Sequence, residues 1–378
     1  MRVLCHAQHL TGVGHFVIAH NIARGLAEAH DVYLVQGGRP VPRRSTTTEP
    51  HCIALPILHR ADGQLVADGG GAAAAVLTRR ADLLADAARD IRPDVVLVDH
   101  YPFSKWELHP EISAAISAAR AANPRVKVVC SLRDIAPRTR YEDMTEAEHA
   151  SHVVELLGDW FDALLVHADP DFVRLDEHFS GADAIPVPLT YTGFVTEALP
   201  PPPLAPTPWA VASGGGADTT AFLVSTIRAF RHFAESGAVH PMRLQVFCGL
   251  GAGDDDRAAL DQAAGSGPID VHAFSPAFLS WLHGAALSIS RAGYNTTAAL
   301  LRSGIPAVVV PGPRLSDQRP RAQRLADAGL AVFVDSDRET DVAEMASAME
   351  QALTTPLPPH TFDLDGVAAT QRFLETLV

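Results

Sequence analysis

The chain has 378 residues, of which 47% are hydrophobic, and a formal net charge of −14. This length exceeds that of one typical domain, so we expect two domains with sizeable cores. The negative charge argues against nucleic acid or an anionic membrane as the general partner, although a local site for phosphate stays compatible with it.

The cysteines and the first residues predict a cytoplasmic protein. The four cysteines lie in or beside strand-like runs without CxxC spacing, as is typical of reduced, mostly buried thiols: Cys5, Cys52, Cys130 and Cys248. The chain opens directly into a strand, and we find neither a signal segment nor an apolar run long enough to span a bilayer. We therefore expect cytoplasmic localisation and no transmembrane segment.

The N-terminal stretch has the pattern of a nucleotide-binding α/β domain. A strand over Arg2–His6 is followed by the glycine-rich turn TGVGH at 11–15 and an amphipathic helix over Phe16–Ala29. Gly14 lets the backbone come close to a ligand. His15 stands at the helix start, where the helix dipole would keep its imidazole neutral as a base, or where it would only cap the helix. The sequence leaves both interpretations open.

Polar residues follow several predicted strands of this half. We expect strands over Asp31–Val35, Cys52–Leu55, Asp94–Val98, Val126–Ser131 and Ala163–Val166, a Gly/Ala-rich loop over 62–74, and a helix over Ala75–Ile91. Open α/β sheets bind ligands at the carboxyl ends of their strands. The candidates there are Asp99, His100, Tyr101, Arg133, Asp134, His167 and Asp169. Each alone is also compatible with a cap or a salt bridge, and Asp169 is best explained as a cap ahead of Pro170.

A proline-rich run, LPPPPLAPTP at 199–208, marks the domain boundary because it can form neither helix nor inner strand. We place one domain at 1–198 and the other at 209–362. The second opens with a strand over Trp209–Ala212 and a second glycine-rich turn, formed by Gly214, Gly215 and Gly216. Three successive glycines let backbone amides surround phosphate oxygens, although the spacing is not that of a P-loop.

Further strands are expected over Met242–Phe247, Ile269–Ala273, Leu287–Ser290 and Ala307–Val310, with helices between them. This second βαβαβ pattern predicts an α/β fold of two Rossmann-like, doubly wound domains that face one another across a cleft. The last segment, 363–378, contains a helix over Val367–Leu377 that we expect to pack back on the first domain.

The stretch 287–330 carries the predicted phosphate site. After the turn Arg291-Ala292-Gly293, Asn295 and Thr296 can cap a helix whose free N–H groups and dipole favour phosphate, with the charge of Arg291 beside them. A second helix, over Gln318–Ala328, follows a Pro-Gly-Pro turn. Asp317 and Gln318 either cap that helix or bind sugar hydroxyls. Phe274 and Ser275 either lie against a nucleobase or belong to the core.

Taken together, these motifs resemble those of GT-B glycosyltransferases, and most closely of the MurG-like glycosyltransferase family 28. The resemblance rests on SRAGYNTTAALLRSGIPAVVVPGP at 290–313 and on six shorter blocks: TGVGH, VDHYPF, SLRD, HADP, YTGFV and SGGGAD. It covers most of the chain. No single block is specific, but the set is.

The resemblance implies a nucleoside-diphosphate sugar, usually a UDP-sugar, bound by the C-terminal domain. The implied roles fall on Gly214, Gly215 and Gly216 for the glycine loop, on Phe274 and the adjoining Ser275 for the base, on Arg291, Ala292, Gly293, Asn295 and Thr296 for the diphosphate, and on Asp317 and Gln318 for the sugar. Relatives usually carry a ribose-binding glutamate where this chain has Ala299, which puts UDP in doubt more than the fold.

The leading hypothesis is an inverting, metal-independent glycosyltransferase in which His15, or else Asp99 or Asp134, deprotonates an acceptor hydroxyl. No metal or other cofactor is expected, because no DxD-like pair stands at a strand end. We expect the acceptor to be a small molecule or a lipid of bacterial secondary metabolism, contacted by Gly14, His100, Tyr101, Arg133 and His167. The alternatives are a UDP-sugar 2-epimerase on the same fold and a non-catalytic nucleotide-sugar binding protein.

Overall fold

The computed structural model describes residues 1–10, 12–42, 48–61, 63–135, 144–205, 207–214, 219–236, 241–313 and 317–378. The chain divides into two compact units. The N-terminal unit comprises Met1–Pro40, Ser45–Thr196 and Phe362–Val378, and the C-terminal unit comprises Val41–Arg44 and Glu197–Thr361.

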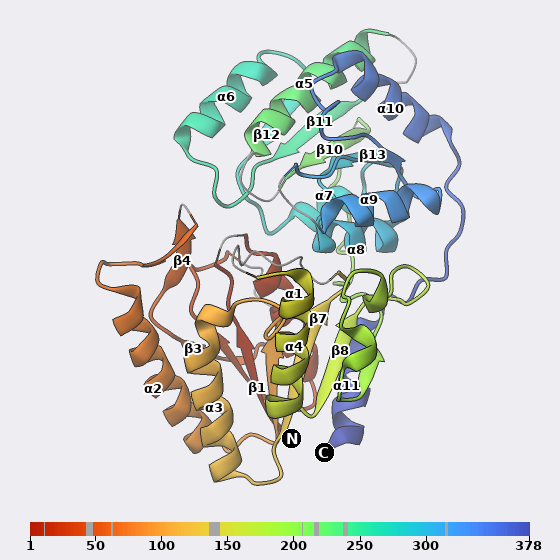
Figure 1. Ribbon diagram of the computed structural model, residues 1–378. Coiled ribbons are helices and arrows are strands. Elements are labelled where there is room, and N and C mark those ends of the chain that lie inside the picture. Colours follow the sequence, from red (N-terminus) through yellow and green to blue (C-terminus); the bar gives the residue numbers. More distant parts are fainter. Residues whose placement is uncertain are drawn as a thin grey trace. The chain divides into compact units, whose positions relative to one another are not determined.

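The N-terminal unit is built on a parallel sheet of seven strands in the order β3-β2-β1-β6-β7-β8-β9. The strands are β1 (Arg2–Ala7), β2 (Asp31–Gln36), β3 (His51–Ala54), β6 (Val95–Asp99), β7 (Lys127–Arg133), β8 (Ala163–His167) and β9 (Leu189–Tyr191). The inner strands are runs of buried Val, Leu and Cys, as expected of a parallel sheet that helices cover on both faces. The helices are α1 (Gly14–Leu26), α2 (Ala73–Ile91), α3 (His109–Ala122), α4 (Glu146–Trp160) and α11 (Gly366–Leu377), and α2 and α3 lie side by side (Figure 1).

A small antiparallel hairpin interrupts the predicted loop over 62–74. Strand β4 (Leu58–Ala61) pairs with β5 (Gln64–Ala67), so the loop prediction is wrong over Gln64–Ala67. The hairpin has a physical reason, because Leu58 and Ala67 face one another across it and are buried against Leu10. That contact buries one face of an otherwise polar ribbon.

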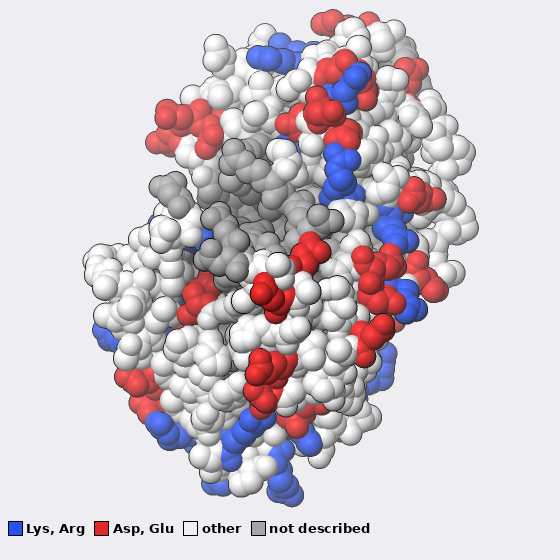
Figure 2. Space-filling view, in the orientation of Figure 1, with Lys and Arg blue, Asp and Glu red and all other residues white. Residues whose placement is uncertain are grey.

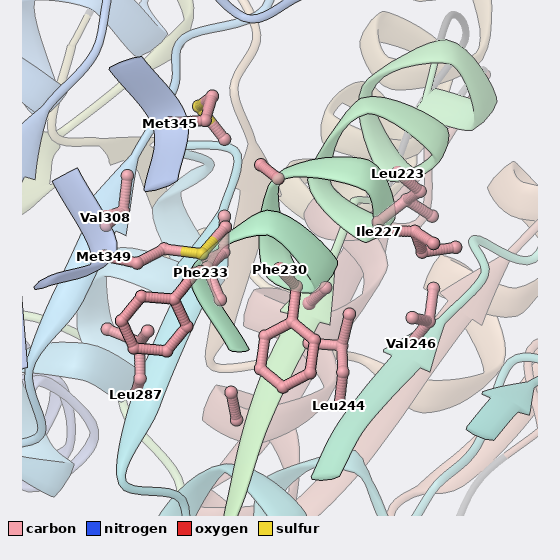
Figure 3. Packing of buried hydrophobic residues seen from close by; sticks show 14 of the residues in the cluster. Leu223, Ile227, Phe230, Phe233, Leu244, Val246, Leu287, Val308, Met345 and Met349 are labelled. Atoms are coloured by element: carbon pink, nitrogen blue, oxygen red, sulfur yellow. The ribbon is translucent and has the colours of Figure 1, made fainter. Parts of the chain in front are cut away.

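The C-terminal unit contains a parallel sheet of six strands in the order β12-β11-β10-β13-β14-β15. The strands are β10 (Trp209–Ser213), β11 (Arg243–Phe247), β12 (Ile269–His272), β13 (Leu287–Ser290), β14 (Ala307–Val309) and β15 (Val332–Phe333). The helices are α5 (Thr219–Glu235), α6 (Asp254–Ala264), α7 (Phe278–His283), α8 (Tyr294–Ser303), α9 (Gln318–Asp327) and α10 (Val342–Thr354). The core lies between the sheet and α5 and α10, where Phe230, Phe233 and Met349 pack on Leu244 and Leu287 (Figure 3).

Both units have the strand order of a Rossmann fold, since in each the first strand lies beside the second on one side and the fourth on the other. The predicted fold class, α/β with two Rossmann-like doubly wound domains, is thereby confirmed. In each unit the order reverses beside the first strand, and the carboxyl ends of β1 and β6, and of β10 and β13, flank these switch points.

The last residues of the chain belong to the N-terminal unit. Helix α11 packs on α1, with Val367 against the backbone at Gly25, and Val195 forms an isolated bridge with Asp365. The carboxylate of Asp169 accepts a hydrogen bond from the backbone N–H of Asp363 at 2.6 Å. The start and the end of the polypeptide therefore both belong to the N-terminal unit (Figure 1).

Charged side chains of both signs are interspersed over the face seen in Figure 2, and no broad basic surface stands out on it. Over the described part of the chain, none of the helices combines the length and the apolarity needed to cross a bilayer.

Candidate active site

His15 lies at the switch point of the N-terminal sheet, one residue into α1. The helix has Val13 as its N-cap and no side-chain cap, so His15 does not cap it. Instead, Nδ1 of His15 lies 3.0 Å from Oδ2 of Asp99 at the end of β6, and Nη2 of Arg133 lies 2.7 Å from Nε2. Because a guanidinium can only donate, Nε2 is the acceptor and Nδ1 carries the proton that is donated to Asp99.

Asp99 is buried and ionised. Lys105 donates a hydrogen bond to its Oδ2 at 2.5 Å, and only 4% of the Asp99 side chain is exposed. Burial alone would raise the pKa of Asp99, but the charge of Lys105 and the contact with His15 hold it well below its usual range. The carboxylate is therefore available to orient the imidazole and to stabilise it when it takes a proton.

His15 is neutral at pH 7. Burial, followed by the charges of Arg133 and Lys105, lowers the pKa of His15 to about 3 against the opposing effect of Asp99. The sequence predicts the neutral form but attributes it to the helix dipole. The structure attributes it to burial and two neighbouring cations. A neutral imidazole with Nδ1 held by a carboxylate is the form in which Nε2 can accept a proton.

His100 packs edge-on against His15, with ring centroids 4.7 Å apart. Its Nδ1 lies 3.0 Å from Oγ of Ser104, while its Nε2 is buried and has no hydrogen-bond partner among the described residues. His100 and Lys105 both have φ of +66°, a left-handed conformation that non-glycine residues rarely adopt. The loop between them is thus held in a strained shape that brings both side chains to Asp99 and His15.

Three other predicted residues make internal contacts instead. Asp134 is fully buried and accepts the backbone N–H of Ile135, and the buried hydroxyl of Tyr101 bonds Nδ1 of His109 at 2.5 Å. His167 is fully buried, with its nitrogens 2.7 and 2.8 Å from the hydroxyls of Ser131 and Thr192. The structure thus corrects the prediction for all three, since none presents a polar atom to a ligand. Asp169 accepts the backbone N–H of Asp171, but a turn follows it in place of the expected helix, so it caps no helix.

The predicted phosphate site of the C-terminal unit lies at the switch point of the second sheet. Helix α8 begins at Tyr294, directly after the turn that follows β13. Its N-cap is Gly293, and no side chain caps it, so the predicted cap by Asn295 and Thr296 is wrong. Both residues lie in the first turn of the helix. The amino end of α8 therefore presents backbone N–H groups without a side-chain cap at the N-cap position, as a phosphate site requires.

The positive charge of Arg291 is paired with a carboxylate of the protein itself. Its Nη1 donates to Glu339 Oε2 at 2.6 Å and to the carbonyl of Pro311 at 3.1 Å, and its guanidinium lies over the ring of Phe222. Only 7% of the residue is exposed. The prediction that Arg291 offers a free positive charge to a phosphate is therefore wrong for this structure.

A buried arginine that the sequence analysis missed joins the loops after β13 and β14. Arg321 of α9 donates to the carbonyl of Ala292 at 2.6 Å and to Asp317 Oδ2 at 2.9 Å. Gln318 accepts the N–H of Gly312 at 2.7 Å, and its side-chain nitrogen lies near Gly293. The structure thus brings Ala292, Gly293, Asp317 and Gln318 together. The spacing of four residues between Asp317 and Arg321 on a helix was the available signal.

The remaining predicted donor residues are less closely grouped. At Gly214 a side chain would collide with Thr219, and Gly215 and Gly216 lie outside the described residues. Phe274 and Ser275 are partly exposed, and Ser275 Oγ accepts the N–H of Ala277. Ala299 is buried in α8 and offers no carboxylate. Within the described ranges, no cluster of three or more His, Cys, Asp or Glu could hold a metal ion.

Comparisons with known proteins agree with this architecture. The glycotransferase of kitacinnamycin covers 100% of this chain and 99% of its own, with 18% identity and a TM-score of 0.56. MurG of Acinetobacter baumannii covers 99% of each chain, with 16% identity and a TM-score of 0.55. A putative UDP-N-acetylglucosamine 2-epimerase from Listeria monocytogenes covers 99% of this chain and 94% of its own, with 13% identity and a TM-score of 0.61. At these identities the likeness concerns the fold.

No curated protein is similar enough in sequence to count as a match. The fold is that of the GT-B class, two Rossmann-like domains in one chain. Residues 215–360 match the family described as "Glycosyltransferase family 28 C-terminal domain". The matched residues lie within the C-terminal unit.

Proposed function

We propose that the protein is an inverting, metal-independent glycosyltransferase that moves a sugar from a nucleoside-diphosphate sugar to a hydroxyl of a small molecule or lipid in bacterial secondary metabolism. The observation that carries the proposal is the family 28 match over residues 215–360. The hydrogen-bonded pair of His15 and Asp99 in the other unit supports it, because transfer to a hydroxyl needs a base.

In the proposed mechanism, Nε2 of His15 accepts the proton of the acceptor hydroxyl while its oxygen attacks the anomeric carbon of the sugar. The bond from that carbon to the phosphate oxygen breaks, and the nucleoside diphosphate leaves with the electron pair. The Nδ1–H···Asp99 hydrogen bond stabilises the imidazolium that forms. Arg133 must first release Nε2, because its guanidinium donates to the lone pair that takes the proton.

On the donor side, we assign the diphosphate to the amino end of α8 and the sugar to Asp317 and Gln318. Arg321 supports this assignment, because it ties the turn at Ala292 to Asp317 and fixes both loops. The family's ribose glutamate is absent at Ala299. We propose UDP as the first donor nucleotide to test, because the resemblance to family 28 implies it, and other nucleotides beside it, because the ribose glutamate is absent.

The test is a donor screen with and without acceptors. Purified protein is incubated with UDP-sugars and dTDP-sugars, and release of nucleoside diphosphate and formation of glycoside are followed by mass spectrometry. Acceptor-dependent release that disappears in His15→Ala supports the proposal. If no sugar nucleotide yields a glycoside with any acceptor, yet the protein binds the nucleotides, a non-catalytic binding protein is the better description.

The epimerase alternative has one specific observation in its favour. The Listeria protein named as a putative UDP-N-acetylglucosamine 2-epimerase gives a TM-score of 0.61, against 0.56 and 0.55 for the two transferases compared above. An epimerase would convert UDP-N-acetylglucosamine with no acceptor present. Incubation with this compound alone, analysed by proton NMR of the sugar, distinguishes the two reactions.

A further inference from the structure

The hydrogen bond of Arg133 to His15 differs from those of Arg291 and Arg321, which each donate to a carboxylate of the protein. Arg133 donates from Nη2 to Nε2 of His15, a neutral nitrogen, at 2.7 Å, and among the described residues its side chain has no other hydrogen bond. A bond to a neutral acceptor is weaker than one to a carboxylate. The Arg133 side chain is partly exposed at the end of β7, so it can leave Nε2 without breaking a buried ion pair.

Nε2 of His15 has one lone pair, and Arg133 occupies it. Because Nδ1 donates its proton to Asp99, Nε2 is the ring nitrogen left to accept a second proton. A proton on Nε2 would remove the acceptor and place two cations at the distance of a hydrogen bond. The bond from Arg133 and a proton on Nε2 therefore exclude one another. By linkage, the bond holds the imidazole neutral, and a group that displaces Arg133 makes protonation of His15 easier.

The groups that face His15 come from β6, the loop after it, and β7: Asp99, His100, Lys105 and Arg133. The charge of Lys105 is paired, because its ammonium donates to Asp99. The charge of Arg133 is not paired in this way, and it opposes a proton on the imidazole. Movement of Arg133 away from His15 would thus have two effects at once, since it frees the lone pair of Nε2 and raises the pKa of the ring.

We propose that the Arg133–His15 hydrogen bond is a latch on the catalytic base: Arg133 occupies the lone pair of Nε2 until the acceptor hydroxyl displaces it. This inference rests on the proposed function and names a way in which the same site is regulated. An acceptor can displace the guanidinium because its contacts elsewhere in the site contribute binding energy. A water molecule has no such contacts. The base is therefore withheld from water while the acceptor is absent.

The reaction that the latch suppresses is hydrolysis of the donor. In that reaction Nε2 of His15 would take a proton from water while the water oxygen attacks the anomeric carbon. The bond from that carbon to the phosphate oxygen would break, the nucleoside diphosphate would leave with the electron pair, and free sugar would form. With Arg133 on Nε2, the proton of the water has no acceptor. The latch thus reserves the sugar nucleotide for transfer.

The first measurement needs neither donor nor turnover. Histidine side chains are labelled with ¹⁵N, His15→Gln assigns the His15 signals, and spectra are recorded as the pH is lowered from 7. In the wild type, Nε2 should be unprotonated and show the shift of a hydrogen-bonded nitrogen. In Arg133→Met that shift should change, and His15 should bind a proton at a higher pH than in the wild type. Arg125→Met, at an exposed position before the amino end of β7, is the control and should match the wild type.

The second measurement is release of UDP or dTDP from the sugar nucleotides of the donor screen with no acceptor present. Arg133→Met should release nucleoside diphosphate about tenfold faster than the wild type. Combining Arg133→Met with His15→Gln should abolish this gain, because the gain depends on the imidazole. A purely structural role of Arg133 would predict loss of activity and no gain that requires His15. Arg125→Met should hydrolyse the donors at the wild-type rate.

The two measurements separate the latch from the proposed function. Wild-type transfer to an acceptor together with equal hydrolysis in the wild type and Arg133→Met would refute the latch alone. If none of these proteins consumes a sugar nucleotide, with or without acceptor, the proposed function fails, and the His15 spectra alone decide the latch. Spectra that are the same in Arg133→Met and the wild type overturn it. If Arg133→Met does not fold, the wild-type spectrum decides, since an Nε2 signal without a hydrogen bond at pH 7 contradicts the latch.

Discussion

Lys105, Asp99 and His15 form a chain of hydrogen bonds in which each residue fixes the state of the next. The ammonium of Lys105 keeps Asp99 ionised, and the carboxylate of Asp99 keeps the His15 proton on Nδ1. The lone pair is then confined to Nε2. This arrangement makes the base depend on Asp99 as strongly as on the imidazole itself.

Asp99→Asn should lower kcat by about 10²–10⁴-fold. The amide of an asparagine can donate to Nδ1, which would move the imidazole proton to Nε2 and abolish the base. The affinity for UDP, measured by calorimetry, should stay unchanged, because Asp99 belongs to the N-terminal unit. The exposed Asp90→Asn on α2 is the control. If Asp99→Asn turned over at the wild-type rate, the pair of His15 and Asp99 would not act as the catalytic base.

His167 should make the N-terminal unit sensitive to acid. Burial lowers its pKa from 6.5 to about 4, so between these values the unfolded chain binds a proton that the folded chain does not. Stability from this residue is complete above pH 6.5 and is lost as the pH falls toward 4. Between pH 7 and pH 5 the loss is about 2 kcal/mol.

Urea unfolding at pH 7 and pH 5, followed by the fluorescence of Trp106 and Trp160, measures this difference. His167→Gln should show a pH-dependent loss smaller by about 2 kcal/mol than the wild type. His152→Gln, whose side chain is 41% exposed in the wild type, should behave as the wild type does. Equal pH dependence in His167→Gln and the wild type would contradict the interpretation of His167 as a buried neutral group.

At the scale of elements, the sequence predicted the parallel strands well, because long buried runs of Val and Leu are unambiguous. It missed β9 and β15, which are three and two residues long, and the β4–β5 hairpin. The Asp62-Gly63 pair between alternating residues is a hairpin signal. The neighbouring run of glycines and alanines pointed to a loop instead. The hairpin depends on the burial of Leu58 against Leu10, a tertiary contact that the local sequence does not show.

A buried ionic network fixes α2 in the N-terminal unit. Arg80 is fully buried and donates to both oxygens of Glu111 on α3, to Gln8, and to the carbonyls of Gly37 and Pro56. His6 of β1 bonds Glu111 as well. Although burial opposes it, the bonds from Arg80 and His6 lower the pKa of Glu111 to about 2. Glu111 therefore stays charged, and its charge depends on Arg80.

Arg80→Met should destabilise the N-terminal unit by about 3–5 kcal/mol, since it leaves the Glu111 carboxylate buried without its main partner. Replacing both residues, in Arg80→Met with Glu111→Leu, should restore part of the loss. Urea unfolding with the fluorescence of Trp106 and Trp160 gives the values. The exposed neighbour Arg79→Met is the control and should change stability little. A loss in Arg79→Met as large as that in Arg80→Met would refute the role of the network.

Gly293 at the amino end of α8 has no structural need to be glycine. Its φ is −71°, and among the residues that the structure describes a Cβ there would meet Gln318 Nε2 alone, at an ordinary distance of 3.9 Å. Gly293→Ala should therefore fold with stability within about 0.5 kcal/mol of the wild type. The same Cβ would stand in front of the helix N–H groups. The affinity for UDP, measured by calorimetry, should fall at least about tenfold. Gly251→Ala, at an exposed and open position, is the control. If the wild type and both variants bound UDP with equal affinity, the diphosphate would not bind at the amino end of α8.

At the scale of the molecule, the residues that the sequence analysis named were informative, but their partners were not predictable. His15 and Asp99 are 84 positions apart, and Arg133 lies 118 positions from His15. Arg291 was expected to face a phosphate, yet it pairs with Glu339, 48 positions away. Strand ends tell which residues reach one edge of a sheet, but the pairing among them depends on side-chain packing that no local pattern encodes.

The C-terminal segment follows the C-terminal unit in sequence but belongs to the N-terminal unit in space, where the sequence analysis expected its helix to pack. Phe362 packs on Phe172, Asp363 bonds Asp169, and Thr196 bonds the carbonyl of Leu364. These contacts predict that deletion of residues 362–378 destabilises the N-terminal unit and leaves the C-terminal unit unchanged.

The four tryptophans allow each unit to be observed separately, since Trp106 and Trp160 lie in the N-terminal unit and Trp209 and Trp281 in the C-terminal unit. In thermal unfolding of variants that keep only one pair, the truncated chain should lose several degrees of Tm in the N-terminal signal, because about 1 kcal/mol corresponds to about 2–4 °C for a unit of this size. The C-terminal signal should not move. A C-terminal signal that falls instead would mean that the segment stabilises the unit that precedes it in sequence.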